Sequence, residues 1–224
     1  MSSISALTII IHIVAGSLTL ITGPIAIFTN NRNTRLHRIV GKTFFIAMNI
    51  VCISAIMGYF RHSDQIFYQF LLGISVLVYA GILRGVRAIQ IMKGGTVKVF
   101  DFVYSGALGL FGLWMLGMGV WHIMIGSMIA FPILFGIFGL GAVKDAFENF
   151  KNFKHPEYLS PRDWMRLHVL TMIGAFIAST TAFTVNTAHY LPWFVQWFGP
   201  TLVLLPLQFY WGRKLKPIKT ISVN

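Results

Sequence analysis

Seven long apolar runs occupy most of the 224-residue chain. A helix needs roughly 20 mostly apolar residues to cross the hydrocarbon core of a bilayer, which is about 30 Å thick. The runs cover residues 7–28, 39–60, 66–89, 103–120, 123–143, 167–185 and 191–211, and only Trp121 and His122 separate the fourth from the fifth. The sequence therefore predicts an all-α, polytopic transmembrane bundle of about seven helices. We expect one domain over residues 1–212 and a short basic tail over 213–224.

The composition also favours a membrane protein. Hydrophobic residues make up 56% of the chain and charged residues only 11%, against about 25% charged residues in a typical soluble domain. The 18 Lys and Arg residues outnumber the 6 Asp and Glu residues and give a net charge of +12. In a soluble protein this excess would suggest nucleic acid as a partner. Here the basic residues lie between apolar runs, so we expect the lipid bilayer as the partner and no nucleic acid.

The basic residues fall almost entirely on one side of the expected bundle, with Arg61 as the single exception. The first connection carries Arg32, Arg35, Arg38 and Lys42, the third Arg84, Arg87, Lys93 and Lys98, the fifth Lys144, Lys151, Lys154, Arg162 and Arg166, and the tail Arg213, Lys214, Lys216 and Lys219. Cytoplasmic loops of membrane proteins carry an excess of Lys and Arg. The distribution therefore predicts an N-terminus outside the cell and a cytoplasmic C-terminus.

Two histidines, His37 and His168, lie at the cytoplasmic side of the expected bundle. Ionisable groups at membrane depth are costly, so they point to a functional site. Two imidazoles from different helices can supply both axial ligands of a haem. One hypothesis is therefore a cofactor site formed by His37, His168, Arg38 and Arg166, with haem b or a divalent metal as the cofactor. The alternative is that both histidines are interfacial or hydrogen-bonded caps, because the two arginines place them at the water boundary.

The same two histidines with Asp101 and Asp145 form a second hypothesis, an inner metal site. Zinc hydrolysis needs about three protein ligands and an open coordination position. No pair of these residues has the HExxH spacing of many zinc hydrolases. The catalytic residues of such an enzyme stay unassigned.

Four other histidines form an outer layer: His12, His62, His122 and His189, with Asp64 beside His62. These histidines could bind copper or zinc, which is the outer metal hypothesis. They could instead sense pH, since histidine titrates near neutral pH. At 1.5 Å per residue, His12 is about 24 Å from the inner end of its helix near Phe28. One metal ion therefore cannot bridge the two layers.

Small residues mark two packing features. A stripe of small and polar residues follows one face of the sixth run at helical spacing: His168, Thr171, Ala175, Ser179, Ala182 and Asn186. It either packs against neighbouring helices through hydrogen bonds or lines a cavity. Glycines recur in the fourth and fifth runs, where they allow helices to approach closely: Gly106, Gly109, Gly112, Gly117, Gly119, Gly136, Gly139 and Gly141.

Four segments of the chain resemble a family of predicted bacterial membrane proteins, domain of unknown function 2306. They are His12-Ile-Val-Ala-Gly16, Thr22-Gly23-Pro24, Leu36-His37-Arg38-Ile-Val-Gly41 and Asp163-Trp164-Met165-Arg166-Leu167-His168. The resemblance covers the first two helices and the start of the sixth. It implies a multi-pass protein of the bacterial inner membrane and carries no known reaction.

Our leading interpretation is an integral inner-membrane protein with a histidine-lined site for a metal, haem or small ligand, with a redox role as one version. The absence of a Gly-rich phosphate loop, a serine nucleophile elbow or a cysteine pair gives no support to nucleotide binding or the familiar hydrolase motifs. The alternatives are a non-enzymatic transporter, sensor or assembly scaffold, and a zinc-dependent membrane hydrolase. Whether the chain is an enzyme stays open.

Overall fold

The computed structural model describes residues 3–29 and 33–216, and this part of the chain is helical throughout apart from its connections. Seven α-helices and one short 3-10 helix follow one another: α1 Ser3–Thr29, α2 Thr34–Arg61, α3 Ile66–Met92, α4 Val99–Met124, α5 Ala130–Lys154, η1 Pro156–Tyr158, α6 Pro161–Thr187 and α7 Trp193–Lys214. The prediction of an all-α transmembrane bundle is confirmed.

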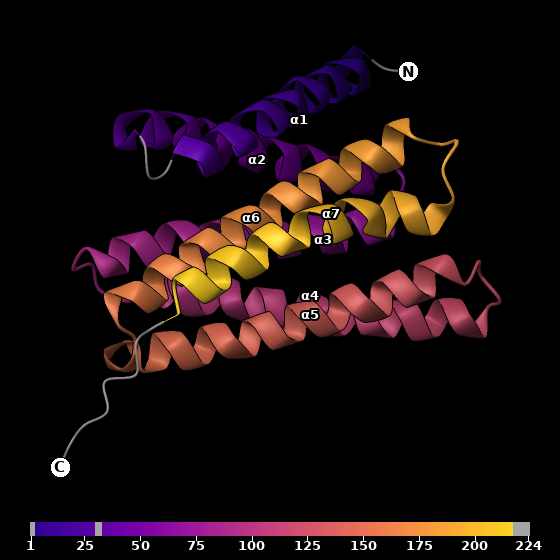
Figure 1. Ribbon diagram of the computed structural model, residues 1–224. Helices are drawn as coiled ribbons and strands as arrows, with labels where there is room; N and C mark the ends of the chain where they lie inside the picture. Colours follow the sequence, from indigo (N-terminus) through magenta and orange to yellow (C-terminus); the bar gives the residue numbers. More distant parts are fainter. Residues whose placement is uncertain (1–2, 30–32, 217–224) are drawn as a thin grey trace.

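Helices α1 to α6 are long and apolar enough to cross a membrane. The last helix, α7, has 22 residues and is long enough, but it is less apolar because it contains tryptophans, glutamines and Pro200 and Pro206. It lies against α6 along its length (Figure 1). The protein is therefore a multi-pass membrane protein in which α7 differs in composition from the other helices.

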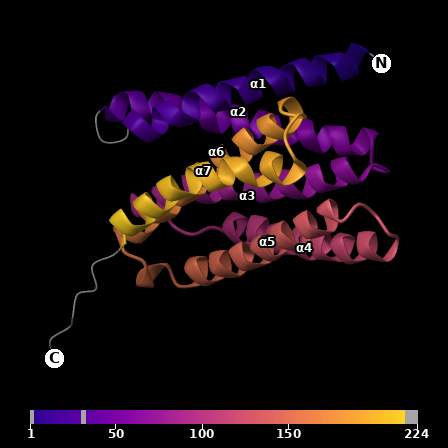
Figure 2. The same ribbon diagram turned by 45° about the vertical axis from the view of Figure 1, so that its right-hand side comes forward.

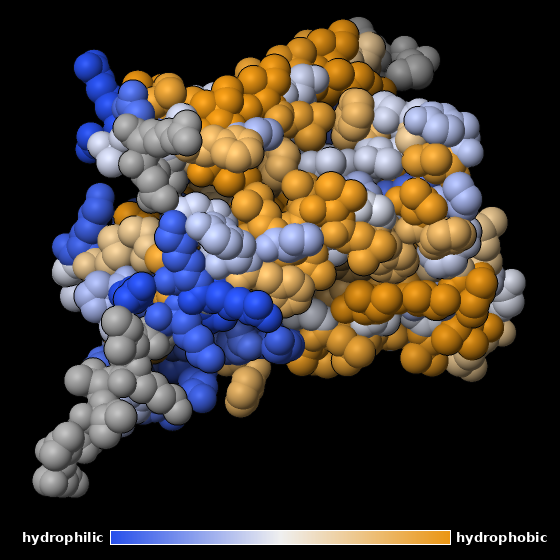
Figure 3. Space-filling model, viewed as in Figure 1, coloured by the Kyte–Doolittle hydropathy of each residue, from blue (hydrophilic) through white to orange (hydrophobic). Residues whose placement is uncertain are grey.

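The helices alternate in direction, so their ends fall into two groups. The starts of α2 and α6 and the end of α7 lie at the left of Figure 1, and the α4–α5 and α6–α7 turns lie at the right. Hydrophilic residues gather at the left end in Figure 3, which we call the basic end. Arg32 and Lys219 lie outside the described residues. The alternation brings the described members of the four basic groups to one end, and the side of the membrane on which it lies stays a prediction.

Helices α3 and α6 form the centre of the bundle. Helix α3 packs against α2, α4, α5 and α6, and α6 also packs against α1 and α7. The α4–α5 hairpin lies on one side of this centre and the α1–α2 hairpin on the other, in both views of the ribbon (Figures 1 and 2). No extensive packing joins α5 to α6 or α7 within the described residues.

Glycines permit the closest helix contacts, as the sequence predicts for α4 and α5. A Cβ atom on Gly112 would lie 2.9 Å from the backbone nitrogen of Val143, whereas one on Gly117 would meet nothing within 4 Å. The α3–α6 contact is equally close, since a Cβ on Gly85 would lie 2.6 Å from Thr171 Oγ1. Close packing therefore depends on a few of the glycines.

The turn between α4 and α5 falls later than the expected boundary at Trp121 and His122. Helix α4 continues to Met124, and the backbone reverses at Gly126, whose φ of +69° favours glycine. The backbone N–H of Ser127 then donates to the carbonyl of His122. The position of the reversal depends on local turn geometry, which the pattern of apolar residues does not predict.

Candidate functional site

His37 and His168 each bond to the backbone of a neighbouring helix. The Nδ1 atom of His37 lies 2.9 Å from the carbonyl oxygen of Ala26 in α1, and that of His168 lies 2.9 Å from the carbonyl oxygen of Gly85 in α3. A carbonyl only accepts, so Nδ1 carries the proton and Nε2 of each neutral ring is an acceptor. The two histidines lie near the starts of α2 and α6, which are both at the basic end.

The arginines of the cofactor hypothesis contact other groups. Arg38 Nε lies 3.3 Å from the carbonyl oxygen of Thr34 in its own exposed helical turn. Arg166 Nε donates to the carbonyl of Gly212 at 2.9 Å and so ties α6 to α7. Both arginines therefore use their Nε–H groups on backbone carbonyls.

Asp101 and Asp145 pair with arginines of α3. Asp101 is fully buried, and its two carboxylate oxygens accept from Arg87 at 2.6 and 2.7 Å. Asp145 lies 3.7 Å from Arg84. Among the described residues, no three or more His, Cys, Asp or Glu side chains are grouped to hold a metal ion. The structure therefore does not assemble a three-ligand zinc site from the four inner residues.

The outer histidines lie in separate environments. His12 Nδ1 lies 2.7 Å from Ser54 Oγ, and both nitrogens of His122 have partners, Ser127 Oγ at 2.8 Å and Gln69 Oε1 at 3.0 Å. The ring of His62 lies 4.6 Å from that of Tyr68, and His189 and Asp64 are exposed. The structure does not bring the outer set together.

A large crevice opens between the α4–α5 hairpin and helices α6 and α7. Its volume is about 940 Å³, and α3 forms its floor. Along α3 it runs from Phe67 to Arg84, about 26 Å at 1.5 Å per residue, which is most of the thickness of the hydrocarbon core. It exists because α5 packs on α3 and α4 but not extensively on α6 or α7.

Part of the stripe on α6 lines this crevice. Thr171, Ala175, Ala182 and Asn186 face it, together with other small residues of the same helix. Ser179 instead donates within α6 to the carbonyl of Phe176. Of the stripe, His168 bonds to a neighbouring helix, at the carbonyl of Gly85 in α3.

The two arginines of α3 that the sequence treated as topology charges have different roles. Arg87 makes four hydrogen bonds of 2.6–2.8 Å, to Asp101, Gln90 and the carbonyl of Thr96. Arg84 is 8% exposed and lines the crevice, yet it makes no hydrogen bond within the described part of the chain. Their position inside a predicted span was the sequence feature that could have identified them.

Two half-buried carboxylates of α5 lie beside Arg84. Asp145 Oδ1 is 3.7 Å and Glu148 Oε2 is 3.6 Å from its guanidinium nitrogens, and Lys144 Nζ lies 3.8 Å from Glu148. These separations are too long for hydrogen bonds. The crevice is therefore lined by apolar side chains of α3 and by small and polar side chains of α6. Toward the basic end it has a group of incompletely paired charges, which we call the charged mouth (Arg84, Asp145 and Glu148).

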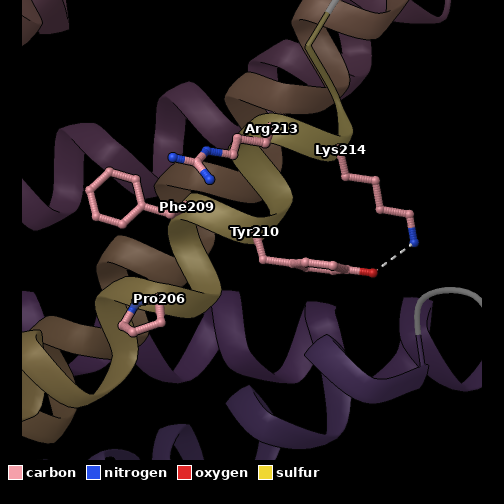
Figure 4. Close-up of a pocket in the computed structure, with 5 residues that line it drawn as sticks. All are labelled: Pro206, Phe209, Tyr210, Arg213 and Lys214. Carbon is pink, nitrogen blue, oxygen red and sulfur yellow. Dashed lines mark hydrogen bonds between the residues drawn. The ribbon is translucent and has the colours of Figure 1, made fainter.

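A second hollow, of about 760 Å³, lies at the basic end of α7. Figure 4 shows that one helix alone supplies its residues: Pro206, Phe209, Tyr210, Arg213 and Lys214. Lys214 Nζ lies 3.3 Å from the hydroxyl of Tyr210 and 4.8 Å from the ring centroid of Trp211. Aromatic and basic residues mix in this way at membrane interfaces. We interpret this hollow as an interfacial anchor of α7.

No protein-family model, curated protein or solved structure matches the chain. The resemblance to domain of unknown function 2306 stays a prediction.

Proposed function

We propose that the protein binds an amphiphilic small molecule, taken from the bilayer, in the crevice between the α4–α5 hairpin and helices α6 and α7. The observation that carries the proposal is the combination of size and lining in one space. A volume of about 940 Å³ lies in the usual range of small-molecule sites, about 300–1,000 Å³. Its lining passes from apolar side chains of α3 to the charged mouth.

This polarity matches an amphiphile. An apolar chain in the crevice would contact Leu71, Ile74 and Leu77 of α3, and its polar end would reach Arg84. Lipid chains are as apolar as these side chains, so burial alone gives little selectivity in a membrane. Affinity must therefore come from close packing and from the charged mouth. Binding of this kind suits a carrier, a sensor or the first step of a reaction on a lipid.

The test is photo-crosslinking in liposomes with a phospholipid that carries a diazirine in the middle of one acyl chain. Mass spectrometry of the digested protein then maps the labelled peptides. We expect labels on the crevice residues of α3 and α6 at a higher yield than on the lipid-facing residues of α1. Uniform labelling of all lipid-facing helices would contradict the proposal.

A second candidate is a metal or haem held by His37 and His168. One observation favours it: both Nδ1 atoms donate to backbone carbonyls, the arrangement that commonly orients metal-binding imidazoles. Neither histidine lines the large crevice. A Soret band in detergent-purified protein that is lost in His37→Ala or His168→Ala would support haem. A colourless, metal-free preparation from cells supplied with haem would eliminate this candidate.

A further inference from the structure

The charged mouth restricts which amphiphile fits the crevice. Arg84 is nine-tenths buried, and its guanidinium has N–H donors that no hydrogen bond uses in the described residues. Among the described residues, the wholly buried side-chain N and O atoms without a hydrogen bond belong to Tyr104 and Asn149, so the Arg84 nitrogens stay accessible from the crevice that the residue lines. An arginine fork matches the oxygens of a phosphate or carboxylate. Arg84 is therefore suited to an anionic group entering along the crevice.

The neighbouring carboxylates disfavour a purely anionic headgroup. Asp145 and Glu148 lie within 3.7 Å of Arg84 and remain half-buried at the edge of the crevice. An anion on Arg84 would meet two negative charges at close range, where Coulomb repulsion is strong. A purely cationic headgroup would meet Arg84 itself. Lys144 and Lys151 also line the crevice, but both are exposed to solvent.

We propose that the crevice selects a zwitterionic phospholipid whose headgroup joins a phosphate diester to a primary ammonium, as in phosphatidylethanolamine. This inference rests on the proposed function. The phosphate binds Arg84, and the ammonium binds Asp145 and Glu148, so each charge of the mouth gains an opposite partner. A primary ammonium donates hydrogen bonds to carboxylates, whereas a quaternary ammonium has no N–H to donate. The mouth therefore distinguishes ethanolamine from choline as well as from glycerol headgroups.

Native mass spectrometry of the detergent-purified, delipidated protein tests the selection. The probes are three dioleoyl phospholipids with identical chains and ethanolamine, choline or glycerol headgroups. We expect the ethanolamine lipid to bind at least about tenfold more tightly, as one extra charge-assisted hydrogen bond would provide. Equal binding of all three would overturn the headgroup selection and leave the crevice as a lipid site. Tightest binding of the glycerol lipid would show an anion site instead, and no binding of any lipid would overturn both proposals.

Matched variants test which side chains of the charged mouth bind the ammonium and the phosphate. Glu148→Gln removes one carboxylate of the mouth, and we expect it to abolish most of the preference for ethanolamine over choline. Glu157→Gln makes the same chemical change on an exposed residue that pairs with His155, and should retain the preference. Arg84→Lys keeps the charge but loses the fork, so we expect weaker binding of all three lipids. An unchanged preference in Glu148→Gln would overturn the assignment of the ammonium to this carboxylate.

Discussion

Arg87 of α3 holds Asp101 of α4 through two parallel hydrogen bonds, Nε to Oδ1 at 2.6 Å and Nη2 to Oδ2 at 2.7 Å. The carboxylate also accepts from the backbone N–H of Lys98 at 2.8 Å and so caps the start of α4. The pair joins the α4–α5 hairpin to the central helix. The hairpin forms one wall of the crevice, so this ion pair also helps to fix the position of that wall relative to α3.

Removing one member of the pair should destabilise the protein strongly. In Arg87→Ala the buried carboxylate of Asp101 loses its counter-ion, and breaking a buried ion pair in this way costs about 3–5 kcal/mol. Arg84→Ala, one helical turn away, removes only ion pairs of 3.6–3.7 Å to half-buried partners, and should cost much less. Thermal unfolding in detergent measures both variants. Equal losses of thermal stability in the two variants would contradict the conclusion that Arg87, and not Arg84, stabilises the fold.

Close packing of α4 on α5 gives a second prediction. Gly112→Ala places a methyl group 2.9 Å from the backbone nitrogen of Val143, and overpacking of this kind typically costs about 1–3 kcal/mol. Gly117→Ala, on the same helix, meets nothing within 4 Å and should be neutral or slightly stabilising, because alanine favours helix more than glycine does. Thermal unfolding in detergent measures the stability of both variants. A loss at Gly117 as large as at Gly112 would contradict the packing described here.

The predicted topology can be tested with introduced cysteines. The native Cys52 is 3% exposed, so its reaction with a membrane-impermeant maleimide should be minimal. Ser63→Cys lies in the α2–α3 connection and Lys93→Cys at the opposite, basic end. With a cytoplasmic basic end, intact cells should be labelled at position 63 and not at position 93, which should react only after permeabilisation. The reverse pattern would overturn the orientation.

The apolar runs predicted the number, order and type of the helices because each run is long enough to span the hydrocarbon core. They placed helix ends less well: α5 continues to Lys154, eleven residues past the expected end at Val143. Hydropathy marks the part of a helix that lies in hydrocarbon, and a helix can continue into the polar interface. The turn at Gly126 was displaced for a different reason, because it depends on a positive φ that hydropathy does not report.

The candidate site was less accessible to sequence analysis. His37 and His168 were singled out as candidates at one end of the bundle, but hydropathy does not encode the order of helices around it. Their carbonyl partners belong to other helices and depend on tertiary packing. The position of the crevice was not predicted because it arises where α5 makes few contacts with α6 and α7, and hydropathy does not report which helices pack together. Arg84 and Arg87 lie one turn apart in the same apolar run, and only the surrounding structure shows that Arg87 makes four hydrogen bonds while Arg84 makes none within the described residues.

A side chain that fills the crevice should block the binding of lipid there. Gly81 lines it, and a Cβ atom there would meet nothing within 4 Å, so the side chain of Gly81→Phe has open space at its base and should occupy part of the crevice. Gly141→Phe is the matched control, since Gly141 is equally open and does not line the crevice. With the diazirine phospholipid, we predict that Gly81→Phe loses most of the crosslinks to α3 and α6 while Gly141→Phe retains them. Undiminished crosslinking in Gly81→Phe, in protein that is folded, would contradict the account.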